Sequence, residues 1–410
     1  MRVMRLLLFF CVALLGILSD FVAASEGQTV TTSIELKKAL TQIGPGTRIA
    51  VAPGIYEGGI YLNDVQGTQE APIVITAADP TRPPIFTSRG EGAKLSGCSY
   101  VKLSSLVFQE TGGNGVNIDD GGQAERPSHH LVLEGLEFRR IGPKGNIDAL
   151  KLSGVQQFIV RDCHFASWGG SAIDLVGCQN GLIEGCQLRG GETGFRNANG
   201  IQIKGGSRLI LVQNCLFRHA GQRTLNIGGL TGAAYFRPAV EGFEARDVTV
   251  AGNFFIGSEA PIAWVTAQDS HVHHNLFYLP GKWVGRILQE TDDAGFRPCG
   301  RGLFERNLAV LDDRVKTPIN VGRGTDPVSF VFRNNAWFKP GSYGRPRFEV
   351  AERQGIYDLD PMILDTGSGL LKPNSADPRI RQVGPWDYQP WTAAEDFADI
   401  AVAPVVLPER

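Results

Sequence analysis

Hydrophobic and polar residues alternate with a period of two in short segments that return along the middle of the chain. FIVRDCHF, GLIEGCQL and VTVAGNFF share one order, in which a small or amide residue separates two apolar strands. The equivalent central positions are Leu106, Leu136, Cys163, Cys186, Cys215, Asn253, Asn275, Asn307 and Asn335. They recur roughly every 22 to 38 residues, a spacing typical of solenoids. Because period-two alternation indicates strands, the pattern predicts an all-β, single-stranded, right-handed parallel β-helix with this column in its interior.

A second set of strands supplies a candidate binding face. It comprises GNGVNID, IDALKLSG, SAIDLVG, NGIQIKGG, RTLNIGG and TPINVGRG. After the inward apolar residue of each strand, the next position is predicted to point outward. These positions hold Asn117, Lys151, Asp174, Gln202, Asn226 and Asn320. Strands about 4.8 Å apart would gather these amides, carboxylates and cations into one patch.

The two ends of the solenoid differ from its middle. Within TSIELKKALTQIGPG, one helical face is apolar and Gly44-Pro45-Gly46 marks a stop. The residues of that face are Ile34, Leu36, Ala39, Leu40 and Ile43. A helix here would cover the open N-terminal strand edges. We therefore expect a β-helix with an N-terminal cap over residues 25–338 and an irregular C-terminal tail, 339–410, packed on the helix.

The first residues carry a targeting pattern. A basic MRVMR precedes the apolar LLLFFCVALLGIL and the small residues Val22-Ala23-Ala24. This order predicts a signal peptide over residues 1–24, cleaved near Ala24, and a secreted protein that is extracellular or periplasmic. The apolar run is short for a membrane span, and we expect no span in the mature chain.

Charge and cysteine content narrow the function further. The formal net charge is −2 and no basic stretch appears, which argues against a nucleic-acid partner. Cys163, Cys186 and Cys215 fall on consecutive turns of the inward column, where small buried thiols fit well. We therefore expect buried thiols rather than a disulfide framework, and a monomeric protein.

Two stretches resemble a known family. GTRIAVAPGIYEGGIYLNDVQGTQEAPIVITAAD looks like the opening of polysaccharide lyase family six, the chondroitinase B-like and alginate lyase-like proteins. NGIQIKGGSRLILVQNCLFRHAGQRTLNIGG and VTVAGNFFIG resemble that family's catalytic stretch, so the similarity covers about residues 45–275. The resemblance implies a Lys base at Lys204 and an Arg about one turn later. Asn226 and Ile227 stand where that family has Arg-His, and Arg223 is the nearby substitute.

The resemblance also implies calcium, but its acidic ligands are poorly matched. Asn199 and Gln202 lie where a Glu is expected. Asp148, Asp174 and Asn199 offer an alternative oxygen set that could hold Ca²⁺.

These residues lead to a functional hypothesis. We expect a polysaccharide lyase that cleaves an acidic, uronate-containing polysaccharide by β-elimination, with Lys204 as base, Arg223 as carboxylate clamp and His219 as proton donor. Long insertions over 229–247 and 279–301 add aromatic and Arg side chains suited to sugars. The predicted substrate contacts are Lys151, Asp174, Asn199, Gln202, Asn226, Arg237 and Trp283.

Two alternatives stay open at this point. One is a non-catalytic glycan-binding or cell-surface structural β-helix. The other is a polygalacturonase-like glycoside hydrolase, which would use two carboxylates such as Asp148 and Asp174.

Overall fold

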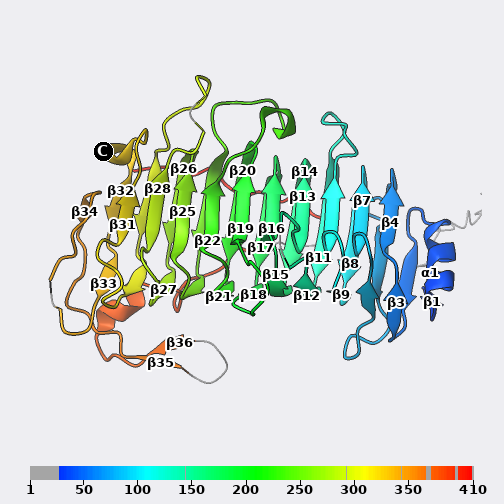
Figure 1. Cartoon of the computed structure of the whole chain (residues 1–410), viewed down its shortest axis with the longest axis horizontal. Helices are drawn as coiled ribbons and strands as arrows, with labels where there is room; N and C mark the ends of the chain where they lie inside the picture. Colours follow the sequence, from blue (N-terminus) through cyan, green and yellow to red (C-terminus); the bar gives the residue numbers. More distant parts are fainter. Residues whose placement is uncertain are drawn as a thin grey trace, which may run out of the picture.

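A computed structural model describes residues 27–408 except 144, 292, 343, 366–370 and 393–395. The predicted signal peptide, residues 1–24, lies outside the described residues. The chain coils through three long sheets, which we name A, B and C (Figure 1). Within these sheets neighbouring strands are parallel and come from successive turns, for example Lys151 beside Asp174 and Leu150 beside Ile173. The predicted right-handed parallel β-helix is confirmed.

The described strands of the three sheets have the following bounds. Sheet A has 13 strands: β1 (Gln28–Val30), β2 (Arg48–Val51), β5 (Ile73–Ala77), β8 (Ser99–Ser104), β11 (Ser128–Glu134), β14 (Val155–Arg161), β17 (Gln179–Glu184), β20 (Ser207–Gln213), β23 (Ala245–Ala251), β26 (Ala267–His273), β29 (Gly302–Glu305), β32 (Val331–Arg333) and β34 (Glu352–Arg353). Sheet B has 11 strands: β3 (Ile55–Glu57), β6 (Ile85–Thr87), β9 (Val107–Gln109), β12 (Glu137–Ile141), β15 (His164–Trp168), β18 (Gln187–Arg189), β21 (Leu216–Arg218), β24 (Phe254–Ile256), β27 (Leu276–Tyr278), β30 (Leu308–Val310) and β33 (Ala336–Phe338). Sheet C has 10 strands: β4 (Ile60–Asn63), β7 (Ala93–Ser96), β10 (Val116–Asp119), β13 (Leu150–Ser153), β16 (Ser171–Val176), β19 (Asn199–Lys204), β22 (Arg223–Gly228), β25 (Ala260–Val265), β28 (Gly285–Leu288) and β31 (Ile319–Val321).

The predicted inward column lies at the corner between sheets A and B. All of its residues are at most 1% exposed. In its second half the asparagines form a ladder: the Oδ1 of Asn275 accepts from both the backbone N and the Nδ2 of Asn253, each at 3.0 Å. Asn307 and Asn335 repeat this arrangement. Each amide also donates to a backbone carbonyl, as Asn275 Nδ2 does to Val250 at 2.9 Å, so the buried polar groups of successive turns are satisfied.

The asparagine ladder ends at an acidic residue. Asn335 donates its backbone N to Glu352 Oε1 at 3.2 Å and its Nδ2 to Oε2 at 3.0 Å. The indole of Trp337 donates to Oε2 at 3.3 Å. Burial raises the pKa of Glu352 to about 7, although these donors act to lower it.

The six cysteines of the described residues are free thiols and all are buried, as expected. The thiol of Cys186 lies 3.4 Å from the carbonyl oxygen of Glu184, a weak donor contact. Burial raises the pKa of Cys178 and of Cys299 to about 12. Cys178 and Cys299 therefore act as small core groups and stay protonated.

The predicted N-terminal helix is α1 (Ser33–Leu40), which lies at the N-terminal end of the solenoid (Figure 1). Thr32 caps it, accepting the backbone N–H of Glu35 at 3.2 Å. Leu36 and Ala39 are buried. Ile34 is 82% exposed, so its predicted place on the packed face is wrong; the buried stripe is narrower than the sequence pattern.

The tail that follows sheet B carries a small antiparallel pair, β35 (Ile363–Asp365) and β36 (Leu371–Pro373), and the 3₁₀ turn η3 (Pro378–Gln382). Farther on, Ile400 and Val402 pack on an apolar row of sheet A. Asp396 joins Lys102 at 2.7 Å and Arg161 at 3.2 Å. The tail thereby covers part of the outer surface of sheet A.

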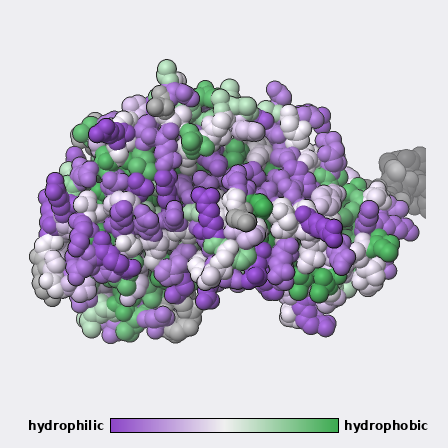
Figure 2. Space-filling view, viewed as in Figure 1, coloured by the Kyte–Doolittle hydropathy of each residue, from purple (hydrophilic) through white to green (hydrophobic). Residues whose placement is uncertain are grey.

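Three loops rise at the edge where the strands of sheet C end, and Figure 1 shows them in cyan, green and yellow-green. They span residues 120–127, 229–244 and 289–301. The second loop contains the 3₁₀ turn η1 (Ala233–Tyr235). Another 3₁₀ turn, η2 (Pro327–Ser329), lies outside these loops and follows β31. The side of the solenoid drawn in this view is largely hydrophilic (Figure 2). No helix within the described residues has the length and apolar character needed to cross a membrane.

Candidate functional site

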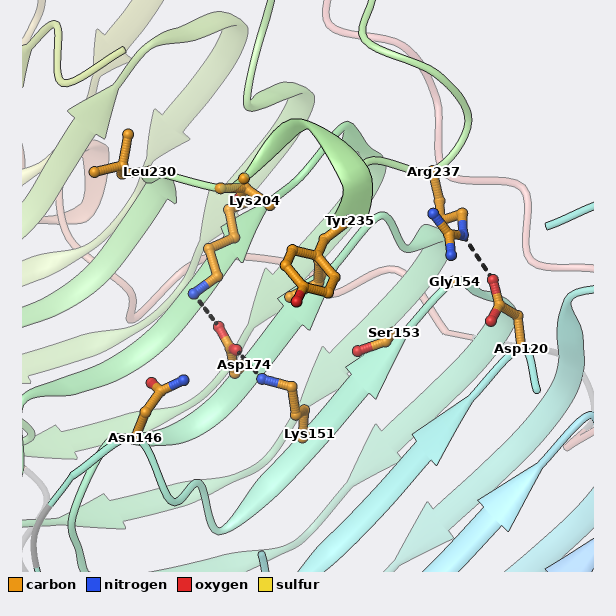
Figure 3. Close-up of a pocket in the computed structure, with 13 residues that line it drawn as sticks. Asp120, Asn146, Lys151, Ser153, Gly154, Asp174, Lys204, Leu230, Tyr235 and Arg237 are labelled. Carbon is orange, nitrogen blue, oxygen red and sulfur yellow. Dashed lines mark hydrogen bonds and ion pairs between the residues drawn. The ribbon is translucent and has the colours of Figure 1, made fainter. Parts of the chain in front are cut away.

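A cleft of about 340 Å³ opens beside sheet C, beneath loop 229–244 (Figure 3). We call it the site cleft. It is lined by Asp120, Asn146, Lys151, Ser153, Gly154, Asp174, Val176, Lys204, Leu230, Thr231, Gly232, Tyr235 and Arg237.

Strand register brings the charged floor of the site cleft together. Lys151 on β13 lies beside Asp174 on β16, and Val176 on β16 lies beside Lys204 on β19. All three charged residues have the outward orientation that the alternation predicts, because the inward positions between them are apolar and buried. A lysine from each side can therefore reach the central carboxylate.

Asp174 is the centre of this cluster and is only 1% exposed. Its Oδ2 lies 2.9 Å from Lys151 Nζ, and its Oδ1 lies 2.9 Å from Lys204 Nζ, as Figure 3 shows. The two lysine side chains are 24% and 13% exposed. A ligand entering the site cleft thus meets ammonium groups, with the carboxylate behind them.

Asp148 supports the cluster from below and is fully buried. Its Oδ1 accepts the backbone N–H of Ser171 at 2.7 Å, and its Oδ2 lies 3.4 Å from Lys151 Nζ. Burial, followed by the charge of Asp174, raises the pKa of Asp148 to about 6. Burial by itself would lower the pKa of Lys151, but Asp174 and Asp148 raise it, so this lysine is charged near neutral pH.

Buried contacts hold loop 229–244 over the site cleft. Glu244 is fully buried; it accepts the backbone N of Thr231 at 2.7 Å and that of Gly205 at 2.8 Å. At the other side, Arg237 Nε lies 2.7 Å from Asp120 Oδ2. Tyr235 is 68% exposed between these anchors, and its hydroxyl points down toward the sheet in Figure 3.

The predicted catalytic roles of Lys204, Arg223 and His219 require the three side chains to meet in one site. The structure does not bring them together. Arg223 begins β22 and pairs in register with Asn199, at the opposite end of β19 from Lys204. Five residues along a strand span about 16 Å. Arg223 instead pairs with Glu290 at 2.6 Å, and His219 lies in the turn after β21, at the same far end of sheet C as Arg223.

Other predicted contacts lie outside the site cleft. Trp283 precedes β28, and two cations lie close to its ring centre: Lys282 Nζ at 4.1 Å and Arg286 Cζ at 4.4 Å. The other three predicted contacts outside the cleft are Asn199, Gln202 and Asn226, which lie on the neighbouring strands β19 and β22 of sheet C. Asn226 donates to Asn199 at 2.9 Å, and Gln202 donates to Ser171 at 2.8 Å.

The proposed calcium ligands do not fit a cation. Both carboxylate oxygens of Asp174 face lysine ammonium groups. Asn199 Oδ1 already accepts from Asn226, and Asp148 is engaged by Ser171 and Lys151. Among the described residues no group of three or more His, Cys, Asp or Glu is placed to hold a metal ion. Lysine charge occupies the position that the sequence suggested for Ca²⁺.

Burial also disfavours Asp148 and Asp174 as hydrolase carboxylates. They are 0% and 1% exposed, so neither can reach a glycosidic oxygen or an attacking water. Asp120 also lines the site cleft but is committed to Arg237.

The sequence pattern did not place Asp120 and Asn146 in the site. Tyr235 belongs to the insertion over 229–247, which was expected to bring aromatic side chains to a sugar, but it was given no role. Asp120 and its partner Arg237 are 117 residues apart, and both lie outside the regular strands. The Asp-Asp-Gly-Gly run at 119–122 was the available signal, because it marks a sharp turn at the end of β10.

Comparisons with known proteins agree with the fold. The family described as the right-handed β-helix region matches residues 91–279. No curated protein matches the chain significantly. A solved PL6 family polysaccharide lyase from Pseudopedobacter saltans aligns with a TM-score of 0.51 and 14% identity over 87% of this chain and 99% of that one. The PL6 family alginate lyase AlyGC aligns with a TM-score of 0.50 and 12% identity over 94% of this chain and 60% of that one. At these identities the likeness shows a shared β-helix architecture.

Proposed function

We propose that this protein binds an acidic, uronate-containing polysaccharide in the site cleft and cleaves it by β-elimination. The observation that carries the proposal is the pair of partly buried lysine ammonium groups that line the site cleft, Lys151 and Lys204, held on either side of the buried Asp174. A carboxylated sugar would find two cations without a metal ion. Solved structures with this fold include PL6 lyases, which supports the same reaction class.

The residues divide into three roles. Lys151 faces the substrate carboxylate and stabilises the negative charge that develops there when the neighbouring C5–H bond breaks. Lys204, as the neutral amine, takes that proton. The C4–C5 double bond forms as the C4–O bond breaks, and Tyr235, the exposed hydroxyl above the cleft, donates a proton to the leaving oxygen.

A specific observation favours binding without cleavage as the second candidate. Lys204 forms an ion pair with Asp174 in the free protein, with Nζ 2.9 Å from Oδ1. A charged Lys204 cannot accept a proton. In that case the same cleft would hold an acidic glycan without breaking it.

One experiment separates these functions. The protein is incubated with alginate, polygalacturonate and chondroitin, and three quantities are followed: ultraviolet absorbance of the unsaturated product, new reducing ends, and retention on gels containing each polymer. Absorbance growing with reducing ends indicates β-elimination; reducing ends alone indicate hydrolysis. Retention alone indicates a binding protein.

Variants assign the reaction to the site cleft. We expect Lys204→Met to abolish the absorbance change. Lys94→Met is the matched control, because Lys94 lies on β7 of the same sheet and also pairs with an aspartate, Asp119, outside the site cleft. Full activity in Lys204→Met would refute its assignment as the base.

A further inference from the structure

A second cleft, of about 660 Å³, lies at the corner between sheets A and B, where the C-terminal tail crosses the turns. We call it the tail cleft. Its polar lining includes His274, Arg306, Asn334, Gln354, Arg381 and Gln382. None of these residues lines the site cleft.

The wall of the tail cleft is a stack of left-handed residues on successive turns. His274, Arg306 and Asn334 each immediately precede an asparagine of the interior ladder and have φ values of 52°, 52° and 56°. The backbone N of His274 donates to the carbonyl of Glu305, and that of Arg306 donates to Arg333. Because adjacent turns are about 4.8 Å apart, their side chains form a closely spaced row of polar groups.

The tail supplies the opposite wall and is fixed in place. Gly384 donates its backbone N to the carbonyl of Arg306 at 2.9 Å. Val383 is 2% exposed, and Trp386 Nε1 donates to the carbonyl of Leu371 at 3.1 Å. These contacts fix the backbone that follows η3, and Arg381, near the end of η3, lines the same cleft as Arg306.

The charge of the tail cleft is unbalanced. Arg306 and Arg381 are both exposed, and neither has an ion-pair partner in the described part of the chain. Asp387 is the one acidic residue among those lining the cleft. The amides of Asn334, Gln354 and Gln382 add donors and acceptors around the two guanidinium groups.

We propose that the tail cleft binds an acidic saccharide, with its carboxylate or sulfate group held by Arg306 and Arg381 and its hydroxyls by the surrounding amides. Guanidinium groups pair well with both kinds of anion, and the cleft has the size of an ordinary ligand site. This second site does not depend on the proposed catalytic function. If one polymer reaches both clefts, attachment at the tail cleft raises its effective concentration at the other.

The test compares Arg306→Gln/Arg381→Gln with Arg189→Gln, an exposed arginine on sheet B outside both clefts. Both the double variant and the control carry Lys204→Met in addition, which prevents cleavage by the proposed reaction. Calorimetric titration with oligogalacturonate and with dextran sulfate oligomers should show binding at least about tenfold weaker in the double variant. Arg189→Gln should bind as its Lys204→Met parent, and neutral dextran should not bind. Equal affinities in the double variant and the control would overturn the proposal.

A second measurement locates the ligand on the Lys204→Met parent protein. Phenylglyoxal modifies accessible arginines, and mass spectrometry of the digested protein reports each one. We expect either anionic oligomer to protect Arg306 and Arg381 but not Arg189. Unchanged modification of both cleft arginines would overturn the proposal, whether or not the protein proves to be a lyase.

Discussion

Replacing Glu352, the last member of the asparagine ladder, should change how the stability of the protein depends on pH. Burial raises the pKa of this carboxyl from its ordinary value of 4.5 to about 7. The folded protein therefore binds a proton that the unfolded chain releases between these pH values. The free energy of unfolding falls as pH rises through this window, because protons are bound more tightly in the folded state. The difference between 4.5 and about 7, at about 1.36 kcal/mol per pKa unit, gives about 3 kcal/mol.

Glu352→Gln keeps the shape and a carbonyl acceptor but removes the titrating proton. Urea unfolding followed by tryptophan emission should show the wild type losing about 3 kcal/mol relative to Glu352→Gln between pH 4.5 and pH 7.5. Titration of Asp148 occurs in both proteins and cancels in the comparison. Glu349→Gln, at an exposed position close by, should give a flat difference across the same range. A flat difference for Glu352→Gln as well would refute the argument from burial.

Three further predictions concern the site cleft and the core. If the protein is a lyase, exhaustive dialysis against a chelator should leave its activity unchanged, because lysines surround Asp174; activity restored by added Ca²⁺ would contradict this. Tyr235→Phe should lower kcat by about 100-fold with an unchanged melting temperature, since the side chain is exposed; undiminished kcat would remove it from the mechanism. Asn275→Ala should lower the free energy of unfolding by about 4 kcal/mol, because two buried donors of Asn253 lose their acceptor at about 1–3 kcal/mol each. Urea unfolding measures this loss, and a change below about 1 kcal/mol would contradict it.

The fold could be predicted because one local rule repeats. Period-two alternation identifies strands, and the recurring column fixes which residues of successive turns lie side by side. Lys151 beside Asp174 follows directly from that register. Interior positions were also predictable, since the Leu, Cys and Asn residues that recur at one place on successive turns have to share one environment.

Position along a strand limited the prediction of the site. Arg223 and Lys204 belong to adjacent turns, but they lie near opposite ends of their strands. Treating neighbouring turns as neighbouring side chains therefore placed Arg223 wrongly. The Arg237–Asp120 pair could not be foreseen either, because it depends on the path of a loop that has no periodicity.

Because the asparagine ladder repeats the same hydrogen bonds on each turn, one complete turn is the unit by which the solenoid could be lengthened or shortened. Every rung from Asn253 to Asn335 donates toward the C-terminus and accepts from the previous turn. A duplicated whole turn would insert an identical rung and leave every neighbour with the partner type it already has. A deletion that removed Glu352 alone would leave the backbone N of Asn335 without its acceptor, and the Nδ2 of Asn335 would keep only the carbonyl of Phe304. The protein can therefore be lengthened or shortened by engineering in complete coils, provided that the acidic terminator is kept at the end.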